Sequence, residues 1–386
     1  MTHNIEVEEM YFGDKLCRHY QVSSMRRVED AFVNQGAQRV CLVSPTGSGK
    51  TTSCGMICSS HVIRKFCGVS NDMDQHDQYK EKLRVLFVAH RDRLLQQAVV
   101  TYAAANGVEL ILQSMFSSIP PDVLEQGWHL TVFDESGHES CNSFQYQLEQ
   151  YTKGANNING FIPLLGLTAT PDRADGMLIK FDTLIDAISR EQAVAEGWLA
   201  ETYLYSFVDP TARDNKVSTL TDMFEHYHQE MGNGIVFVGT KQEAREVTEN
   251  IRRVTGKRVF NAVDVSDVAL NKALDQFSLG EWNFIVNCGK LSEGIDVKKC
   301  STVVIGRTVN SMSLLLQIIG RGARPDSECK IFELVNPLRD NLDTTCAVEP
   351  KCHKLIYKRS GKWVEREFDY STLQSDDSFD LSANRL

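Results

Sequence analysis

A glycine-rich stretch near the N-terminus, Ser44 to Thr52, constrains the fold of this chain more than any other segment. It follows the apolar run Arg39 to Val43 and precedes Ser53 to Lys65, a segment that can continue as a helix. A phosphate-binding loop requires this order of strand, loop and helix, because glycines let backbone N–H groups turn toward an anion and the helix N-terminus adds positive potential. We therefore expect a nucleoside triphosphate to bind here.

Two side chains of this loop have predicted roles of their own. Lys50 is expected to reach the β- and γ-phosphates, and the hydroxyl of Thr51 is expected to hold Mg²⁺. Ser44 replaces the first glycine of the strict G-x-x-x-x-G-K-[ST] pattern, which leaves a glycine-rich turn with a surface lysine as the weaker alternative. The residues expected to hold the nucleotide are Thr46, Gly47, Ser48, Gly49, Lys50, Thr51 and Thr52.

Three later apolar runs are typical of buried parallel strands, and polar residues follow each of them. The runs end at Ala89, Phe133 and Leu167. Ligands of parallel sheets bind at the carboxyl ends of the strands, where these polar residues fall. Asp134 is expected to hold Mg²⁺, largely through water, and Glu135 to orient and deprotonate the attacking water. Polar capping of a strand is the alternative for this carboxylate pair.

The pattern of alternating strands and helices restarts near Gly197 and continues to about Asn336 without a second phosphate loop. Near its end, Gln317, Arg321 and Arg324 are spaced four and three residues apart, which predicts that they share one helix face. Guanidinium groups from a second domain can stabilise charge on the γ-phosphate, an effect on the order of 10³ to 10⁵ in rate. They would reach the nucleotide only when the two domains close.

Composition excludes several classes of protein. A chain of 386 residues is too long for one ordinary domain, and a net charge of −10 argues against coating nucleic acid by bulk charge, although a local basic track is not excluded. No apolar run is long enough to cross a membrane, and the N-terminus lacks the pattern of a signal peptide. We expect a soluble, cytoplasmic protein, in the host cytoplasm if the gene is viral.

Two features near the C-terminus leave alternatives open. Residues 351 to 368 interleave basic residues with Tyr357 and Trp363, which is compatible with a nucleic-acid contact but favours a solvated hairpin. The segment from Ser371 to Leu386 is rich in Ser and Asp. A zinc site is disfavoured because the candidate ligands include no C-x-x-C pair. These candidates are Cys329, Cys346, Cys352 and His353.

The order of the motifs resembles the DEAD/DEAH-like helicases of superfamily 2, over residues 15 to about 336. Eight segments carry the resemblance: Arg18-x-Tyr20-Gln21, Ser44 to Thr51, Ala89-His90-Arg91, Asp134-Glu135-x-x-His138, Thr168-Ala169-Thr170, Val236 to Val238, Gly294-Ile295-Asp296 and Gln317-x-x-Gly320-Arg321-x-x-Arg324. Within the superfamily, Ser292 to Val297 and the Gln317 segment look most like RadD-type repair ATPases and related phage DNA helicases.

The resemblance implies an α/β fold of two tandem RecA-like domains with parallel sheets, an ATP cleft between them and a short C-terminal tail. It implies an ATP-binding domain in residues 1–195, a helicase C-terminal domain in 196–340 and a tail in 341–386. Arg18, Tyr20 and Gln21 would read the adenine. Gly294 and Asp296 would contact the nucleotide from the second domain.

The resemblance also assigns residues to a bound strand and to its coupling with ATP. The strand side would be formed by His90, Arg91, Gln113, Ser114 and Thr240. Coupling would pass through His138, Thr168 and Thr170. One departure is that many relatives have Asp-Glu-x-His, whereas here His138 stands one position later, after Gly137. Either His138 substitutes from that position or coupling is loose.

Together these features predict an ATP hydrolase that uses ATP and Mg²⁺ and acts as a helicase or translocase, with single-stranded or branched DNA favoured over RNA. We expect a monomer whose C-terminal tail could bind a protein partner. The alternatives are an RNA helicase, or an ATP-gated clamp or remodeller that displaces proteins without separating strands. A metabolic kinase that shares only the phosphate loop is disfavoured by the Gln317 to Arg324 segment.

Overall fold

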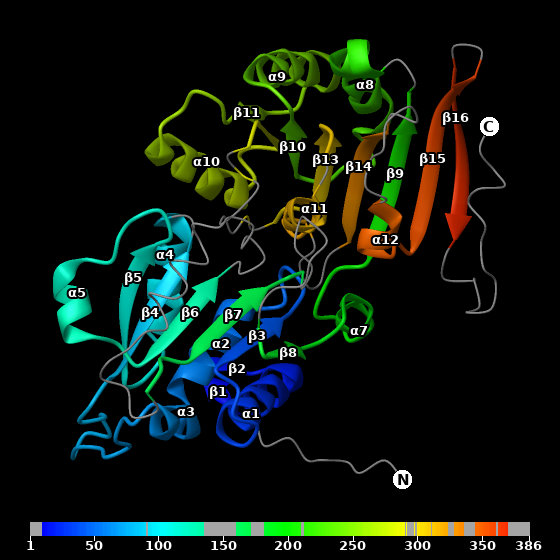
Figure 1. Ribbon diagram of the computed structural model, residues 1–386. Helices are drawn as coiled ribbons and strands as arrows, with labels where there is room; N and C mark the ends of the chain where they lie inside the picture. Colours follow the sequence, from blue (N-terminus) through cyan, green and yellow to red (C-terminus); the bar gives the residue numbers. More distant parts are fainter. Residues whose placement is uncertain are drawn as a thin grey trace, which may run out of the picture. The chain divides into compact units, whose positions relative to one another are not determined.

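The computed structural model of the chain divides into two compact units, Met1–Ala193 and Val194–Leu386. It describes residues 10–89, 92–134, 160–170, 181–209, 212–289, 291, 297, 299–309, 311–322, 328–335, 344–359 and 362–369. Each unit contains a largely parallel sheet flanked by helices (Figure 1), as the α/β prediction requires.

In the described part of the first unit, a six-stranded parallel sheet has the order β5-β4-β6-β7-β3-β8. Its strands are β3 (Arg39–Val43), β4 (Leu83–Ala89), β5 (Val108–Ser114), β6 (Leu130–Asp134), β7 (Leu164–Thr168) and β8 (Thr183–Asp186). The central strands are buried on both faces, which explains their uninterrupted apolar sequences. A small hairpin, β1 (Tyr11–Phe12) and β2 (Lys15–Leu16), precedes the sheet.

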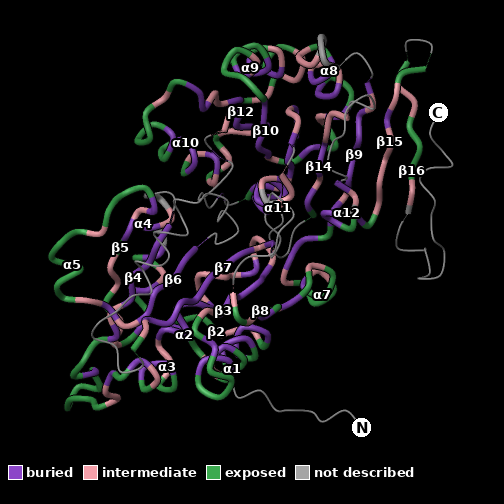
Figure 2. Tube along the Cα trace, viewed as in Figure 1, coloured by how far each residue is buried: buried purple, intermediate pink, exposed green. Residues whose placement is uncertain are grey.

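Helices of the first unit flank this sheet; α1 to α4 share its largest core, and α5 packs against a separate apolar cluster (Figure 2). They are α1 (His19–Val33), α2 (Lys50–Ser59), α3 (His61–Phe66), α4 (Asp92–Tyr102), α5 (Pro121–Gln126) and α7 (Arg190–Ala195), the last of which crosses the boundary between the units. Val22, Met25 and Val28 recur at helical spacing along α1 and are all buried in the core of the first unit.

In the described part of the second unit, an eight-stranded sheet has the order β11-β12-β10-β13-β14-β9-β15-β16. The strands are β9 (Thr202–Val208), β10 (Gly234–Val238), β11 (Val259–Asn261), β12 (Phe284–Asn287), β13 (Thr302–Gly306), β14 (Cys329–Val335), β15 (Cys352–Arg359) and β16 (Lys362–Asp369). The helices are α8 (Ala212–Tyr227), α9 (Lys241–Thr255), α10 (Asp267–Leu279), α11 (Met312–Ile319) and α12 (Thr344–Val348). Apolar clusters cover both faces of this sheet.

Strands β15 and β16 form the predicted hairpin, but they also extend the sheet. β15 pairs in parallel with β9, and β16 pairs antiparallel with β15. The indole of Trp363 packs edge-on against Phe207, with ring centroids 5.4 Å apart. Residues 352–369 are therefore part of the second unit's sheet and not a separate tail.

The fully buried side chain of Arg64 binds the irregular loop between α3 and β4, residues 67–82. Its guanidinium donates hydrogen bonds to the carbonyl oxygens of Ser70 (2.8 Å), Glu81 (2.7 Å) and Gly107 (2.7 Å). It also lies over the ring of Tyr79, 3.8 Å from the centroid. These contacts satisfy a charge that is costly to bury, and they hold both ends of the loop against the sheet.

We expect Arg64→Met to lower the free energy of unfolding of the first unit by roughly 3 kcal/mol, because three partly buried carbonyl oxygens lose a charged donor. Urea denaturation measures the loss, and limited proteolysis should cut residues 66–82 faster. The exposed neighbour Lys65 provides the control, since Lys65→Met should change stability by less than about 0.5 kcal/mol. Equal stability of the two variants would show that the Arg64 contacts do not hold the loop before β4.

Candidate functional site

Three motifs of the first unit meet at one edge of its sheet. β7 lies between β3 and β6, so the ends of these three strands are neighbours. Val43 is in register with Thr168, and Leu167 with Asp134. One further hydrogen bond, from the Ser44 N–H to the Thr168 carbonyl oxygen (2.9 Å), continues the pairing into the loop after β3. The strand order thus brings together residues that are about a hundred positions apart in sequence.

The loop itself has the backbone geometry that its glycines permit. Gly47 and Gly49 have φ values of 89° and 88°, in the left-handed region that glycine adopts without strain. Lys50 begins α2, and its ammonium group donates hydrogen bonds to the carbonyl oxygens of Ser44 (3.1 Å) and Pro45 (3.5 Å). Thr51 lies in the first turn of the same helix and is half-buried. Loop, lysine and threonine therefore lie at the N-terminus of a helix, where anions bind favourably.

Ser44, which departs from the strict loop pattern, braces the loop from within. Its hydroxyl lies 2.5 Å from the hydroxyl of Ser48, which also contacts the carbonyl oxygen of Pro45 at 2.6 Å. Both serine side chains are buried. A glycine at position 44 could not make this contact. The serine spacing of four residues across the turn was the only sequence signal of it.

The segment predicted to read adenine contacts the back of the loop. The Tyr20 hydroxyl donates to the Ser48 carbonyl oxygen (2.5 Å) and accepts from the Arg18 guanidinium (2.8 Å). The Gln21 amide oxygen accepts the Arg18 backbone N–H (2.9 Å). A Cβ on Gly49 would lie only 2.9 Å from the Gln21 amide nitrogen. Gln21 thus caps its own helix and packs on the loop.

The side chains of Cys54 and Cys58, on the helix that follows the loop, lie buried with that of Tyr102. Burial, followed by contact with Cys58, raises the pKa of the Cys54 thiol well above its usual range, and the Asp134 carboxylate raises it further. Burial likewise raises the pKa of Tyr102, which contacts both cysteines. Both groups are therefore uncharged at neutral pH, and Asp134 has no buried thiolate beside it.

Thr168 and Thr170, the predicted coupling residues, form a local turn. The Thr168 hydroxyl donates to the Thr170 carbonyl oxygen (2.7 Å) and accepts the Thr170 N–H (3.1 Å). Both side chains are buried. Because the Thr168 carbonyl also accepts the Ser44 N–H, this turn is bonded directly to the phosphate loop.

In the second unit, the prediction that one helix face carries the arginines is wrong for Arg321. α11 contains Gln317, which is 1% exposed, but the helix ends at Ile319. After the helix, the Arg321 N–H donates to the Ile318 carbonyl oxygen and the Gly322 N–H to the Ile319 carbonyl oxygen. These bonds join residues three apart instead of four, so Arg321 lies in a turn, and it is 9% exposed. Gly320 weakens the helix at this point.

The turn is held close to the sheet by Gly322. A Cβ at this position would lie 2.8 Å from the Cys329 sulfur and 3.0 Å from a methyl carbon of Val303. Arg321 is therefore positioned by packing of its neighbour against β13 and β14.

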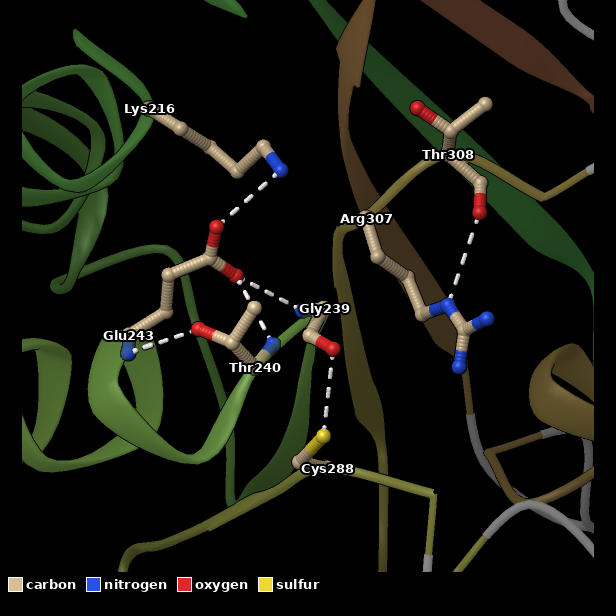
Figure 3. Close-up of polar contacts among 7 residues, drawn as sticks. All are labelled: Lys216, Gly239, Thr240, Glu243, Cys288, Arg307 and Thr308. Carbon is tan, nitrogen blue, oxygen red and sulfur yellow. Dashed lines mark hydrogen bonds and ion pairs between the residues drawn. The ribbon is translucent and has the colours of Figure 1, made fainter. Parts of the chain in front are cut away.

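Thr240, predicted on the strand side, caps α9 (Figure 3). Its hydroxyl accepts the Glu243 N–H (3.1 Å), while the Glu243 carboxylate accepts the N–H groups of Gly239 (2.8 Å) and Thr240 (3.1 Å). Lys216 pairs with the same carboxylate at 3.2 Å. Figure 3 also shows the Cys288 thiol bonded to the Gly239 carbonyl oxygen at 3.2 Å, which ties the end of β12 to this turn.

In the first unit, Gln113 and Ser114 are the last two residues of β5 and lead into the turn that follows it. The Gln113 side chain is buried, and its amide donates to the carbonyl oxygens of Ser114 (2.7 Å) and Ser117 (2.8 Å). The amide thus shapes the turn, and Ser114 is half-buried. Contacts of these residues and of Thr240 with a nucleic-acid strand remain predictions.

Several predicted residues lie outside the described part of the chain: His90, Arg91, Glu135, His138, Gly294, Asp296 and Arg324.

The candidate zinc ligands that the structure describes do not lie together as a group. Cys352 and His353 are adjacent in β15, so their side chains lie on opposite faces of the sheet. His353 contacts the Ser206 hydroxyl (2.9 Å), and the Cys352 thiol contacts Glu367 (3.2 Å). The described residues hold no cluster of three or more metal-binding side chains.

Thr51 and Asp134 nevertheless fit the donor set of magnesium. This ion is bound by few protein oxygens, because it keeps several waters and takes others from phosphates. One hydroxyl and one carboxylate beside a phosphate loop are sufficient on these grounds.

Within the described part of the chain, no helix combines the length and apolar character that crossing a membrane requires.

Two protein families match separate parts of the chain. Residues 14–115 match "Type III restriction enzyme, res subunit", and residues 215–326 match "Helicase conserved C-terminal domain". Among curated relatives, "Putative ATP-dependent helicase IRC3" of Saccharomyces cerevisiae is 22% identical over 86% of this chain and 53% of its own length. The EcoAI endonuclease subunit of an Escherichia coli type I restriction enzyme is 23% identical over 83% of this chain and 46% of its own length. The chain therefore spans about half the length of these relatives.

The fold also matches a solved structure. A fragment of a "putative HsdR subunit of a type I restriction enzyme" from Vibrio vulnificus YJ016 superimposes with a TM-score of 0.65 at 21% identity. The match covers 90% of this chain and 70% of that fragment. At this identity the likeness shows the fold, which is that of two RecA-like domains.

We expect Gly322→Ala to lower the free energy of unfolding by about 1 to 3 kcal/mol, because the added methyl overlaps Cys329 and Val303. Urea denaturation of the single and double variants measures this. Introduced into Cys329→Ala, which removes the sulfur, the same change should cost less than half as much. Equal costs in both backgrounds would mean that the turn does not depend on this contact.

Proposed function

Because the chain belongs to the DEAD/DEAH-like helicases of superfamily 2, we propose that it is a nucleic-acid-stimulated ATP hydrolase that translocates on or unwinds DNA. The main support is the edge of the first sheet where the phosphate loop, Asp134 and Thr168 lie on neighbouring strands. The chain spans about half of its curated relatives, so its role in any larger protein is part of the proposal.

The loop residues bind and orient the triphosphate. Thr46, Gly47, Ser48 and Gly49 direct backbone N–H groups at the phosphates, and the Lys50 ammonium exchanges the carbonyl oxygens of Ser44 and Pro45 for phosphate oxygens. Thr51 and Asp134 hold Mg²⁺, which neutralises phosphate charge when it is bound. Glu135, next in sequence to Asp134, accepts the proton of the attacking water.

Thr168 couples this chemistry to the rest of the first unit. Its carbonyl oxygen holds the Ser44 N–H, and its hydroxyl holds the turn to Thr170. A shift of the loop on loss of the γ-phosphate would therefore be passed to residues 168–170. His138 serves the same coupling from the Asp134 motif.

The second unit supplies the charges that make hydrolysis depend on domain closure. Arg321 and Arg324 stabilise the charge that develops on the γ-phosphate, and Gln317 acts with them from α11. Gly294 and Asp296 contact the nucleotide from the same unit. Hydrolysis in the first unit alone would lack these groups and be slow.

DNA is the preferred track because two relatives are named as subunits of type I restriction enzymes. His90, Arg91, Ser114 and Thr240 form the strand side, with Gln113 supporting the turn at Ser114. The second candidate function is an ATP-gated clamp or remodeller that displaces proteins without separating strands.

A panel of nucleic acids tests the proposal. ATP hydrolysis is measured with single-stranded DNA, forked DNA, duplex DNA and RNA, alongside strand separation of a labelled duplex. Stimulation by single-stranded or forked DNA above RNA supports the proposal, and stimulation without strand separation favours the clamp. A rate that no nucleic acid changes would overturn it.

We expect Lys50→Ala and Glu135→Gln each to abolish ATP turnover, for different reasons. Lys50→Ala removes the cation that holds the phosphates, whereas Glu135→Gln removes only the base, so the second variant should still bind ATP. Steady-state hydrolysis and binding of a fluorescent ATP analogue separate the two effects. Lys65→Ala, on the surface of α3, is the charge-matched control and should hydrolyse ATP normally. Unchanged turnover in Lys50→Ala or in Glu135→Gln would contradict the assignment.

Arg324→Ala should leave ATP affinity within a few-fold of the unaltered chain but lower kcat on the order of 10³-fold, because its charge acts in the transition state. The control is Arg253→Ala, an exposed arginine on α9 of the same unit. A large loss of affinity with kcat unchanged would show that Arg324 binds the ground state only.

A further inference from the structure

The hairpin of β15 and β16 separates its charges by face. Residues directly opposite each other in an antiparallel pair share a face, and neighbours along a strand alternate. One face, here called the helix face, carries Lys354, Ile356, Lys358, Trp363, Glu365 and Glu367. The other, here called the basic face, carries His353, Leu355, Tyr357, Arg359, Lys362, Val364, Arg366 and Phe368. No acidic residue of the hairpin lies on the basic face.

The helix face is occupied by contacts within the second unit. Lys358 pairs with Asp222 of α8 at 2.8 Å, and the Tyr227 hydroxyl donates to Glu365. Lys354 lies 3.7 Å from the Glu365 carboxylate. Ile356 is fully buried. These contacts use the acidic side chains and fix the hairpin against α8.

The cations of the basic face are, by contrast, directed to solvent. Arg359, Lys362 and Arg366 are exposed, and none of them pairs with a carboxylate among the residues that the structure describes. Figure 2 shows β15 and β16 exposed or half-buried along most of their length. The guanidinium of Arg366 lies 5.0 Å from the ring centroid of Phe368. In a chain with a net charge of −10, this is a local concentration of positive charge.

Half-buried aromatic rings lie among these cations. Tyr357 is next to Arg359 along the same face, and Phe368 is next to Arg366 and opposite His353. The His353 ring is held by the Ser206 hydroxyl (2.9 Å), and Ser206 in turn donates to the Glu333 carboxylate (2.6 Å), which also accepts the Thr344 hydroxyl (2.5 Å). Rings between cations on a rigid sheet are the surface on which proteins stack unpaired bases and hold the phosphates beside them.

We propose that the basic face binds single-stranded nucleic acid, as a second contact surface outside the strand side predicted from the helicase motifs. The proposal rests on the proposed function and adds a surface to it. Arg359, Lys362 and Arg366 contact phosphates, and Tyr357 and Phe368 stack on bases. A duplex keeps its bases stacked inside, so it would leave the two rings without a role.

Fluorescence anisotropy with a labelled single strand tests the charges. Arg359→Gln/Arg366→Gln should weaken binding about tenfold at ~0.1 M salt and reduce the slope of log affinity against log salt by about 1.4, as loss of two phosphate contacts requires. Arg253→Gln/Lys272→Gln removes the same charge from exposed positions on α9 and α10 of the same unit and should bind normally.

Tyr357→Leu/Phe368→Leu tests stacking separately. This variant should lose at least about fivefold in affinity with the salt slope unchanged, because stacking releases no counterions. In each hairpin variant, the concentration of single-stranded nucleic acid that gives half-maximal ATPase stimulation should rise by the same factor as its affinity falls. The kcat at saturating nucleic acid should stay constant. Thermal melting equal to that of the unaltered chain shows that the hairpin remains folded.

The outcomes distinguish the two proposals. If the unaltered chain binds the strand and is stimulated by it, while the hairpin variants match the control pair, the basic face does not bind nucleic acid and an acidic protein segment becomes its expected partner. If the unaltered chain neither binds nor responds to any nucleic acid, the proposed function and the basic-face proposal both fail.

Discussion

The hydrogen bond from Ser44 to Thr168 is the contact on which the site of the first unit depends. It extends the pairing of β3 and β7 by one residue and so fixes the point at which the phosphate loop leaves the sheet. β7 also pairs with β6, which places Asp134 on the far side of the same strand. A parallel sheet gathers strand ends at one edge, and this bond holds the loop there. The serine pair Ser44 and Ser48 then stiffens the loop that the bond anchors.

The buried strands could be predicted because burial on both faces demands an apolar run, and every residue of Leu164–Thr168 is buried. β5 and β8 were missed because they lie at the edges of the sheet, where exposure breaks the run with Glu109 and Asp186. The joining of β15 to β9 was missed for another reason. Strand pairing across about 150 residues leaves no local signal, whereas a hairpin does.

The roles of polar side chains were harder to predict from the sequence than the positions of the buried strands. Gln21, Gln113 and Thr240 stand beside turns, and the structure shows each bonded to the backbone of its own turn. Short polar side chains next to a turn have unsatisfied N–H and carbonyl groups within reach, so a local bond competes with a ligand. Lys50 and Asp134 differ because the strand order places them at one sheet edge. The sequence therefore predicted which residues gather at this sheet edge better than the partner of each amide or hydroxyl.

The charges of the hairpin have two physical explanations that its geometry separates. β16 is an edge strand, and charged residues on an edge discourage pairing with another chain. That role requires charge along the strand but not the same sign on one face. Here the two faces differ: Glu365 and Glu367 lie with Lys354 on the helix face, and Lys362 and Arg366 lie with the aromatic rings on the other. Edge protection alone would not separate the signs in this way, whereas a surface for a polyanion with exposed bases requires both the cations and the rings.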